Sequence, residues 1–214
     1  MFDPIAFLRR LGHAVAGLSH PPPSVLAPGV VAMLTWLILR NRWPFADPGV
    51  ALTVAFCCSL GIMFLTRTAR LRTRHPEHFA GISGYVGPLC LLLVISAVLL
   101  SQQSALWTQR YVSLHLGILA LIYVADHLKG PNGDAWLWPR IDGPRLRRAL
   151  SAGAFLWTLA ALILNEYLIR YASLSDWLLA WAFAPVVLHY VSAMTNEVVI
   201  LSAPDDDFSG PDAV

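Results

Sequence analysis

Charged residues are scarce in this chain. They make up 13% of its 214 residues, against about 25% in an ordinary soluble domain. Hydrophobic residues make up 57%, and the mean hydropathy is +0.59. A soluble fold of this length would lack the polar surface needed to cover itself. The net charge of +2 does not favour nucleic-acid binding, because the arginines lie at the ends of apolar segments and form no basic face.

Lysine, cysteine and regularly spaced aspartates are also rare. The chain has one lysine, Lys129, at the end of an apolar segment, which excludes a retinal Schiff base in mid-membrane. Its three cysteines are Cys57, Cys58 and Cys90, without the spacing of a zinc site or a disulfide framework, and we interpret them as small apolar residues. The repeated aspartates of metal-dependent phosphotransferases and prenyltransferases are missing. We therefore predict no cofactor.

What the chain does have is long apolar segments. They lie at residues 24–39, 49–66, 85–100, 111–125, 149–168 and 177–201. A hydrocarbon core about 30 Å thick is crossed by about 20 apolar residues in a helix, and an open structure that leaves backbone groups unpaired is not stable there. The sequence thus predicts an all-α fold, a polytopic membrane helical bundle with about six transmembrane helices over residues 21–203.

The positive residues predict how this bundle is oriented. One set of alternate connections carries eleven of the 15 Lys and Arg residues, and the other set carries four: Arg40, Arg42, Arg110 and Arg170. Short connections rich in Lys and Arg stay on the cytoplasmic side. We therefore expect both termini to be cytoplasmic, in the cytoplasmic (inner) membrane of a bacterium.

The two ends of the chain differ from the bundle. Residues 1–20 combine Phe2, Ile5 and Leu8 with Arg9 and Arg10, which is typical of an amphipathic helix lying on the membrane surface. They lack the order of a signal peptide, so we expect them to be retained. Residues 204–214 are predicted to form an acidic flexible tail.

Aromatic residues near the segment ends are expected to anchor the bundle at the lipid headgroups. They are Trp43, Trp107, Tyr111, Trp136, Trp138, Tyr171 and Trp177. The connection at 130–144 contains two of these tryptophans and is followed by Arg145, Arg147 and Arg148, which can pair with lipid phosphates. Residues 130–148 are therefore either a simple membrane anchor or a surface for other membrane or cytoplasmic proteins.

Polar residues inside the apolar segments are the candidates for function, because an ionisable group in hydrocarbon is costly. They are His115, Asn165, Glu166, His189, Asn196 and Glu197, with Asp126 and His127 at the inner end of the fourth segment. The predicted topology places His115 and Glu166 at similar depth, one turn below the outer surface. His189 lies near the middle on one face with Asn196, and Glu197 is expected near Asp126 and His127. Together they are candidates for a substrate or proton path, although each is also compatible with a simple bond between helices.

Depth argues against two enzymatic interpretations. Ser83 and His115 have the local context of intramembrane serine proteases, but they are predicted at opposite surfaces, roughly 20 Å apart, whereas a Ser–His dyad needs hydrogen-bond contact. His115 and His189 differ in depth by roughly 10 Å, although axial ligands of a haem b must lie at one depth. Haem b binding by these two histidines is kept as a lesser hypothesis.

One segment has a family resemblance. Leu164-Asn165-Glu166, followed by Arg170, Ser173 and Trp177, resembles the C-terminal helix pair of the intracellular septation protein A family. The resemblance covers about residues 147–199, and Arg110-Tyr111-Val112 stands where the family has Lys-Pro-Thr. It implies a small bacterial inner-membrane protein linked with septum formation and envelope synthesis, and it supplies no catalytic residue.

These observations favour a non-enzymatic scaffold or accessory protein of envelope biogenesis in the lipid bilayer, without a nucleic-acid partner. A small proton-coupled transporter using Glu166, His115 and His189 is the second hypothesis, and a haem-binding redox subunit is the third.

Overall fold

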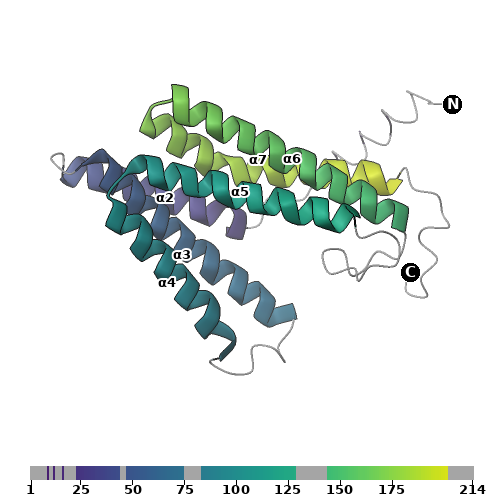
Figure 1. The fold of residues 1–214 in the computed structure, drawn as a ribbon, viewed down its shortest axis with the longest axis horizontal. Helices are drawn as coiled ribbons and strands as arrows, with labels where there is room; N and C mark the ends of the chain where they lie inside the picture. The colour runs from purple at the N-terminus through teal and green to yellow at the C-terminus, as the bar shows by residue number, and fades with distance from the viewer. Residues whose placement is uncertain are drawn as a thin grey trace. The chain divides into compact units, whose positions relative to one another are not determined.

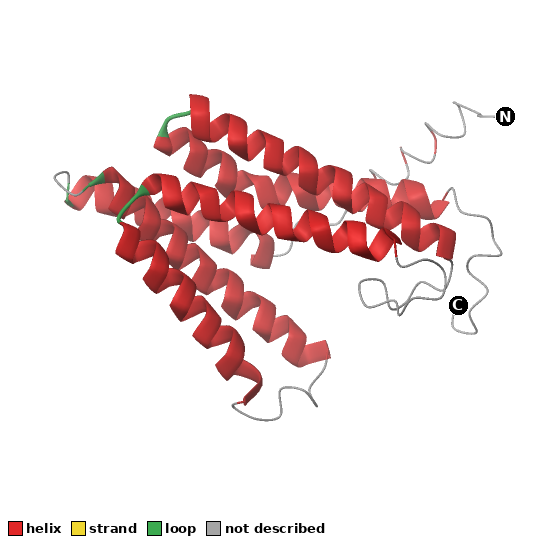
Figure 2. Cartoon of the chain, in the orientation of Figure 1, coloured by secondary structure: helices red, strands yellow, loops and turns green. Residues whose placement is uncertain are grey.

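The protein is almost entirely helical where its structure is described. The computed structural model describes residues 9, 12, 16, 23–43, 47–74, 83–128 and 144–201, and these ranges contain helices joined by short turns (Figure 1, Figure 2). The helices are α2 (Pro23–Arg42), α3 (Pro48–Arg74), α4 (Ser83–Gln102), α5 (Ala105–Leu128), α6 (Pro144–Tyr171) and α7 (Leu174–Leu201). The predicted all-α class with six helices in the bundle is confirmed.

Five of these helices are long and apolar enough to cross a membrane. The qualifying stretches are Val25–Arg42, Pro48–Thr66, Ala105–Leu128, Leu146–Tyr171 and Leu174–Val199. In α4 the described apolar stretch, Leu89–Gln102, is shorter. The whole of α4 has 20 residues and so extends about 30 Å, close to the thickness of the hydrocarbon core. The chain is a membrane-embedded helical protein, and the crossing by α4 stays a prediction.

Three expected features fall wholly or largely outside the described residues. In the predicted surface helix at 1–20, only Arg9, Gly12 and Ala16 are described, and all three are helical. The acidic tail at 204–214 lies outside the description, as does the connection 129–143 with Trp136 and Trp138.

Local sequence explains where α3 and α7 begin. Asp47 precedes Pro48, the first residue of α3, and its Oδ1 accepts a hydrogen bond from the Gly49 amide at 2.6 Å. Ser173 caps α7, because its Oγ accepts a bond from the Asp176 amide at 3.2 Å and donates to Asp176 Oδ2 at 2.7 Å. A side-chain oxygen before the first turn satisfies an amide that has no partner in the helix, and proline is well tolerated at the first helical position.

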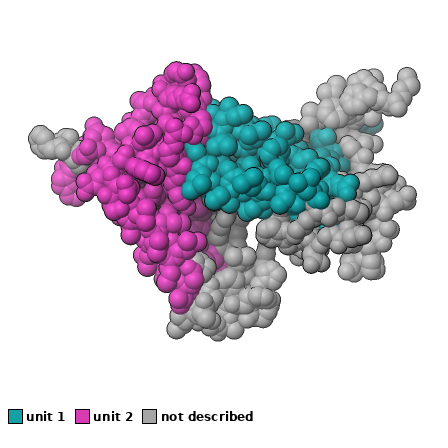
Figure 3. All heavy atoms as spheres, viewed as in Figure 1, with its two compact units in different colours: residues 1–20, 113–164, 188–214 teal, residues 21–112, 165–187 magenta. Residues whose placement is uncertain are grey.

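The residues group into two compact units (Figure 3). Unit 1 comprises residues 1–20, 113–164 and 188–214, and unit 2 comprises residues 21–112 and 165–187. Because α5, α6 and α7 are continuous through the unit boundary, each contributes one part to each unit.

Unit 2 holds its helices together by close backbone approach and buried hydroxyl groups. A Cβ atom added to Gly29 in α2 would lie 2.4 Å from the Ala182 carbonyl oxygen in α7, so only glycine allows this contact. Ser59 in α3 donates to the Pro28 carbonyl at 2.8 Å. Thr53 and Thr108 join α3 to α5 through their hydroxyls at 2.7 Å. Small and hydroxyl-bearing residues at helix contacts are typical of membrane bundles, where lipid provides no hydrophobic force between helices.

An aromatic cluster joins α3, α5 and α7 within unit 2. The Phe56 ring lies 4.9 Å from the Trp181 ring and 5.9 Å from the Tyr111 ring, and Trp177 stacks on Trp181. Trp177 has 0% exposure, so the prediction that it anchors at the headgroups is wrong, because its side chain turns into the bundle. In contrast, three predicted anchors that lie outside this cluster are exposed. They are Trp43, Trp107 and Tyr171.

Candidate functional site

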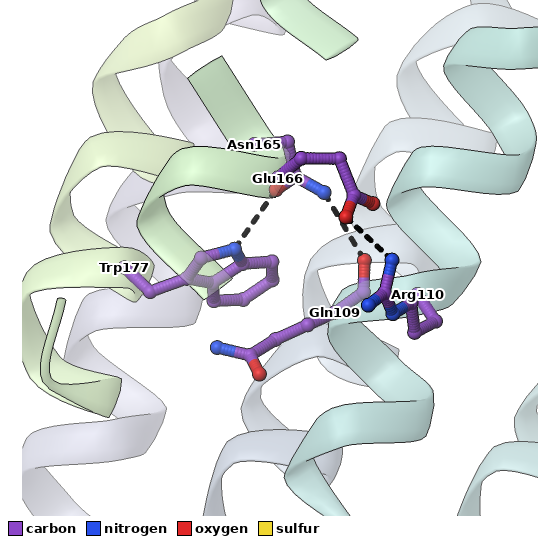
Figure 4. A network of polar contacts seen from close by, with 5 residues as sticks. All are labelled: Gln109, Arg110, Asn165, Glu166 and Trp177. Carbon is purple, nitrogen blue, oxygen red and sulfur yellow. Dashed lines mark hydrogen bonds and ion pairs between the residues drawn. The ribbon is translucent and has the colours of Figure 1, made fainter. Parts of the chain in front are cut away.

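Asn165 joins three helices within unit 2 (Figure 4). Its side chain lies near the C-terminal end of α6 and is 6% exposed. The Nδ2 group donates to the backbone carbonyl of Gln109 in α5 at 3.2 Å. The Oδ1 atom accepts a hydrogen bond from Trp177 Nε1 in α7 at 2.8 Å. We call these three residues the Asn165 network.

The order of the helices explains this network. Asn165 lies in the penultimate turn of α6, and α7 begins at Leu174 after a very short connection. The chain therefore returns at once along α6, and Trp177, in the first turn of α7, comes opposite Asn165. Gln109 lies near the start of α5, which runs from Ala105 to Leu128. Since a buried carboxamide must satisfy both its donor and its acceptor, these contacts offset the cost of burying it.

Glu166, the next residue, forms an ion pair with Arg110. The Glu166 Oε2 and Arg110 Nη1 atoms are 2.5 Å apart, and the side chains are 28% and 47% exposed. The pair carries no net charge, which reduces the cost of placing either ion at the membrane. It also keeps a charged group of α5 beside one of α6, directly next to the Asn165 network (Figure 4).

Arg110 was missed as a site residue. The apolar run suggested a segment from residue 111, whereas α5 begins at Ala105 and contains both Gln109 and Arg110. One signal in the sequence indicates Arg110. A polar pair, Gln109-Arg110, lies near the start of α5, and a matching pair, Asn165-Glu166, lies near the end of α6. The predicted proximity of His115 and Glu166 stays a prediction, because the two residues belong to different units.

A second set of polar contacts joins α5 and α6 within unit 1. Ser151, a buried residue of α6, donates to Asp126 Oδ2 in α5. The neighbouring His127 has its Nδ1 atom 3.2 Å from the Arg148 carbonyl oxygen. Asp126 and His127 thus contact α6, and their predicted proximity to Glu197 in α7 stays a prediction.

A third contact in unit 1 joins α6 to α7. Trp157 Nε1 donates to Thr195 Oγ1 at 3.0 Å, and the Thr195 hydroxyl donates to the Val191 carbonyl at 2.8 Å. Gly153 lies on the same side of α6, where an added Cβ would meet the Thr195 methyl at 3.4 Å. Thr195 therefore marks the face of α7 that packs against α6.

The remaining predicted site residues also lie in unit 1, and they take no part in the hydrogen bond between Trp157 and Thr195. His115 is an exposed residue of α5. His189 and Asn196 are half-exposed on α7, and Glu197 is exposed. The His189 ring meets the Tyr190 ring edge-on at 5.7 Å. Within the described part of the chain, the side chains of His189, Asn196 and Glu197 make no hydrogen bond to another residue.

These contacts are hydrogen bonds and an ion pair that hold neighbouring helices together. Among the described residues, no group of three or more His, Cys, Asp and Glu side chains could hold a metal ion. Within the same residues, every buried side-chain nitrogen or oxygen has a hydrogen-bond partner. Comparisons with family models, curated proteins and solved structures find no match to this chain.

Proposed function

We propose that this chain is a membrane-embedded scaffold or accessory protein without catalytic activity of its own. The observation that supports this most is the Asn165 network, in which the most buried polar side chain of the predicted site hydrogen-bonds neighbouring helices through both its amide group and its oxygen. Both contacts hold α5, α6 and α7 in a fixed arrangement within unit 2, as a scaffold requires.

The partner surface in this proposal is formed by residues 130–148. This connection joins α5 to α6 and combines Trp136 and Trp138 with the arginines that open α6. Indole rings favour the headgroup layer, so a protein binding here would be held at the membrane surface. The excess of Lys and Arg in this connection and in the others on the same side of the bundle supports a cytoplasmic position for both termini.

The setting we propose is the cytoplasmic membrane of a bacterium, in envelope biogenesis or septation. Its support is the resemblance of residues 147–199 to the intracellular septation protein A family, in which Asn165, Glu166 and Trp177 take part.

A proton-coupled transporter is the second candidate, and one observation favours it. The ion pair of Arg110 and Glu166 is partly exposed, so Glu166 can exchange Arg110 for a proton, and Arg110 can exchange Glu166 for an anionic solute. Redox function with haem b bound by His115 and His189 remains the third candidate.

One set of preparations distinguishes the scaffold, the transporter and the haem-binding protein. The full chain and its Glu166→Gln variant are purified in mild detergent, reconstituted in vesicles and assayed for proton flux. The scaffold proposal expects equal background flux, no Soret absorption band and a stoichiometric protein partner. Flux abolished by Glu166→Gln would support the transporter, and a Soret band lost in His189→Ala would support haem binding. Either result would overturn the scaffold proposal.

A further inference from the structure

The C-terminal half of α7 carries a polar stripe formed by His189, Ser192 and Asn196. These residues are spaced by three and four positions, which places them on one face of a helix with 3.6 residues per turn. Ser192 is exposed, and His189 and Asn196 are half-exposed. Among the described residues none of the three side chains hydrogen-bonds another residue, and His189 only meets the adjacent Tyr190 ring.

The stripe does not face α6. Thr195 makes the contact with Trp157, and successive residues are about 100° apart around the helix, so Ser192, Asn196 and His189 lie about 60°, 100° and 120° around the helix from that contact. Ala193, a half-exposed residue with a small side chain, lies beside the stripe.

The stripe runs from the middle of α7 toward its inner end. Within the 28 residues of α7, His189 follows Leu174 by about 22 Å along the axis, near the midpoint, and Asn196 lies about 10 Å beyond it. Lipid chains offer no hydrogen-bond donor or acceptor, so the polar side chains at the depth of His189 and Ser192 require another polar surface, which Asn196 extends toward the inner boundary.

We propose that this surface is the same stripe of a second copy, and that the protein forms a two-fold dimer through α7. Every copy inserts with the same topology, so a two-fold axis along the membrane normal brings each residue to the depth of its counterpart. The three side chains are suited to meeting themselves. A hydroxyl, a carboxamide and an imidazole each carry groups that can hydrogen-bond their own counterpart, so identical residues can pair across the two-fold axis. The ionisable Glu197 would repel its counterpart, and it lies about 100° around the helix from Asn196. This inference does not depend on the scaffold proposal.

Disulfide formation between copies tests the geometry. In the full chain with Cys57, Cys58 and Cys90 replaced by alanine, Ser192→Cys should form a disulfide-linked dimer when membranes are treated with a mild oxidant. Met194→Cys is the matched control, because it lies about 3 Å from Ser192 along the axis but about 160° around the helix. It should stay monomeric. Equal cross-linking at both positions would overturn the proposal.

Association of the unmodified surface is measured by photobleaching of singly labelled chains in vesicles at high lipid dilution. The wild type should bleach mainly in two steps. The triple variant His189→Phe, Ser192→Ala and Asn196→Leu should dimerise at least about tenfold more weakly, because hydrogen bonds between membrane helices are individually modest but act together here. Thr195→Val, which removes the bond to Trp157 instead, should leave the dimer intact and shows that the effect belongs to the stripe.

Two results would contradict the proposal. One is single-step bleaching of a wild-type chain whose Ser192→Cys variant reacts with a water-soluble thiol reagent, which would assign the stripe to a water-lined path. The other is a monomeric full chain that dimerises only when residues 1–20 are deleted, which would assign the stripe to the N-terminal segment.

Discussion

The indole Nε1 of Trp177 donates a hydrogen bond to Oδ1 of Asn165 at 2.8 Å, and both side chains are buried. This bond connects α6 to α7, and the other end of the same carboxamide binds the backbone of α5. One asparagine therefore connects three helices whose apolar surfaces alone would specify little about their register.

Asn165→Leu should destabilise the protein by about 2 kcal/mol, because it leaves the Trp177 N–H and the Gln109 carbonyl without their partner. Reversible unfolding in mixed micelles measures this change. Ser175→Ala, at an exposed position of α7, is the matched control and should be neutral. Equal stability of Asn165→Leu and the wild type would show that the network does not hold these helices.

Gly29→Ala should destabilise the contact between α2 and α7 by roughly 1 to 3 kcal/mol, because the new Cβ would lie 2.4 Å from a backbone oxygen that has little freedom to move. Gly61→Ala in α3 is the control. An added Cβ has no neighbour within 4 Å there, and alanine favours a helix by up to about 1 kcal/mol over glycine. The same unfolding assay compares them, and a neutral Gly29→Ala would show that the close approach does not exist.

Glu166→Gln and Arg110→Gln should each destabilise the protein. The double variant should destabilise it by less than the sum of the two single effects. Each single change leaves one charge without its partner at 2.5 Å, while the double change removes both. Because both side chains are partly exposed, a double-mutant cycle should give a coupling energy of about 0.2 to 1 kcal/mol. Additive effects would mean that the two side chains do not interact.

The topology is tested by cysteine accessibility in a chain without its native cysteines. Gly130→Cys should be labelled from the cytoplasmic side and Ser104→Cys from the opposite side, as the distribution of Lys and Arg predicts. Protection of each site by an impermeant blocking reagent assigns its side. Labelling of both sites from one side would contradict the orientation and the depths inferred from it.

Much of the fold could be predicted because a bilayer requires long apolar helices. The six apolar runs correspond to the six helices, but the helices extend further than hydropathy suggests. α3 continues to Arg74 and α6 begins at Pro144, since arginines near a helix end can reach the headgroups while the backbone stays helical. For the same reason, α5 begins at Ala105, and Arg110 lies inside it as a partner of Glu166.

The direction of individual side chains could not be predicted in the same way. Trp177 lies close to the start of α7, which is typical of a headgroup anchor, yet it is buried because α6 places Asn165 opposite it. Which face of an almost uniformly apolar helix turns inward depends on its neighbours, and the sequence of that helix alone carries little of this information.

Cross-linking mass spectrometry on intact membranes, with the wild type and a variant carrying both Trp136→Ala and Trp138→Ala, tests the scaffold proposal most directly. We expect residues 130–148 of the wild type to cross-link to one partner protein at constant stoichiometry, and the variant to lose this partner while inserting into the membrane normally. A wild-type chain without any cross-linked partner, in vesicles where proton flux depends on Glu166, would contradict the proposal and make the protein a transporter.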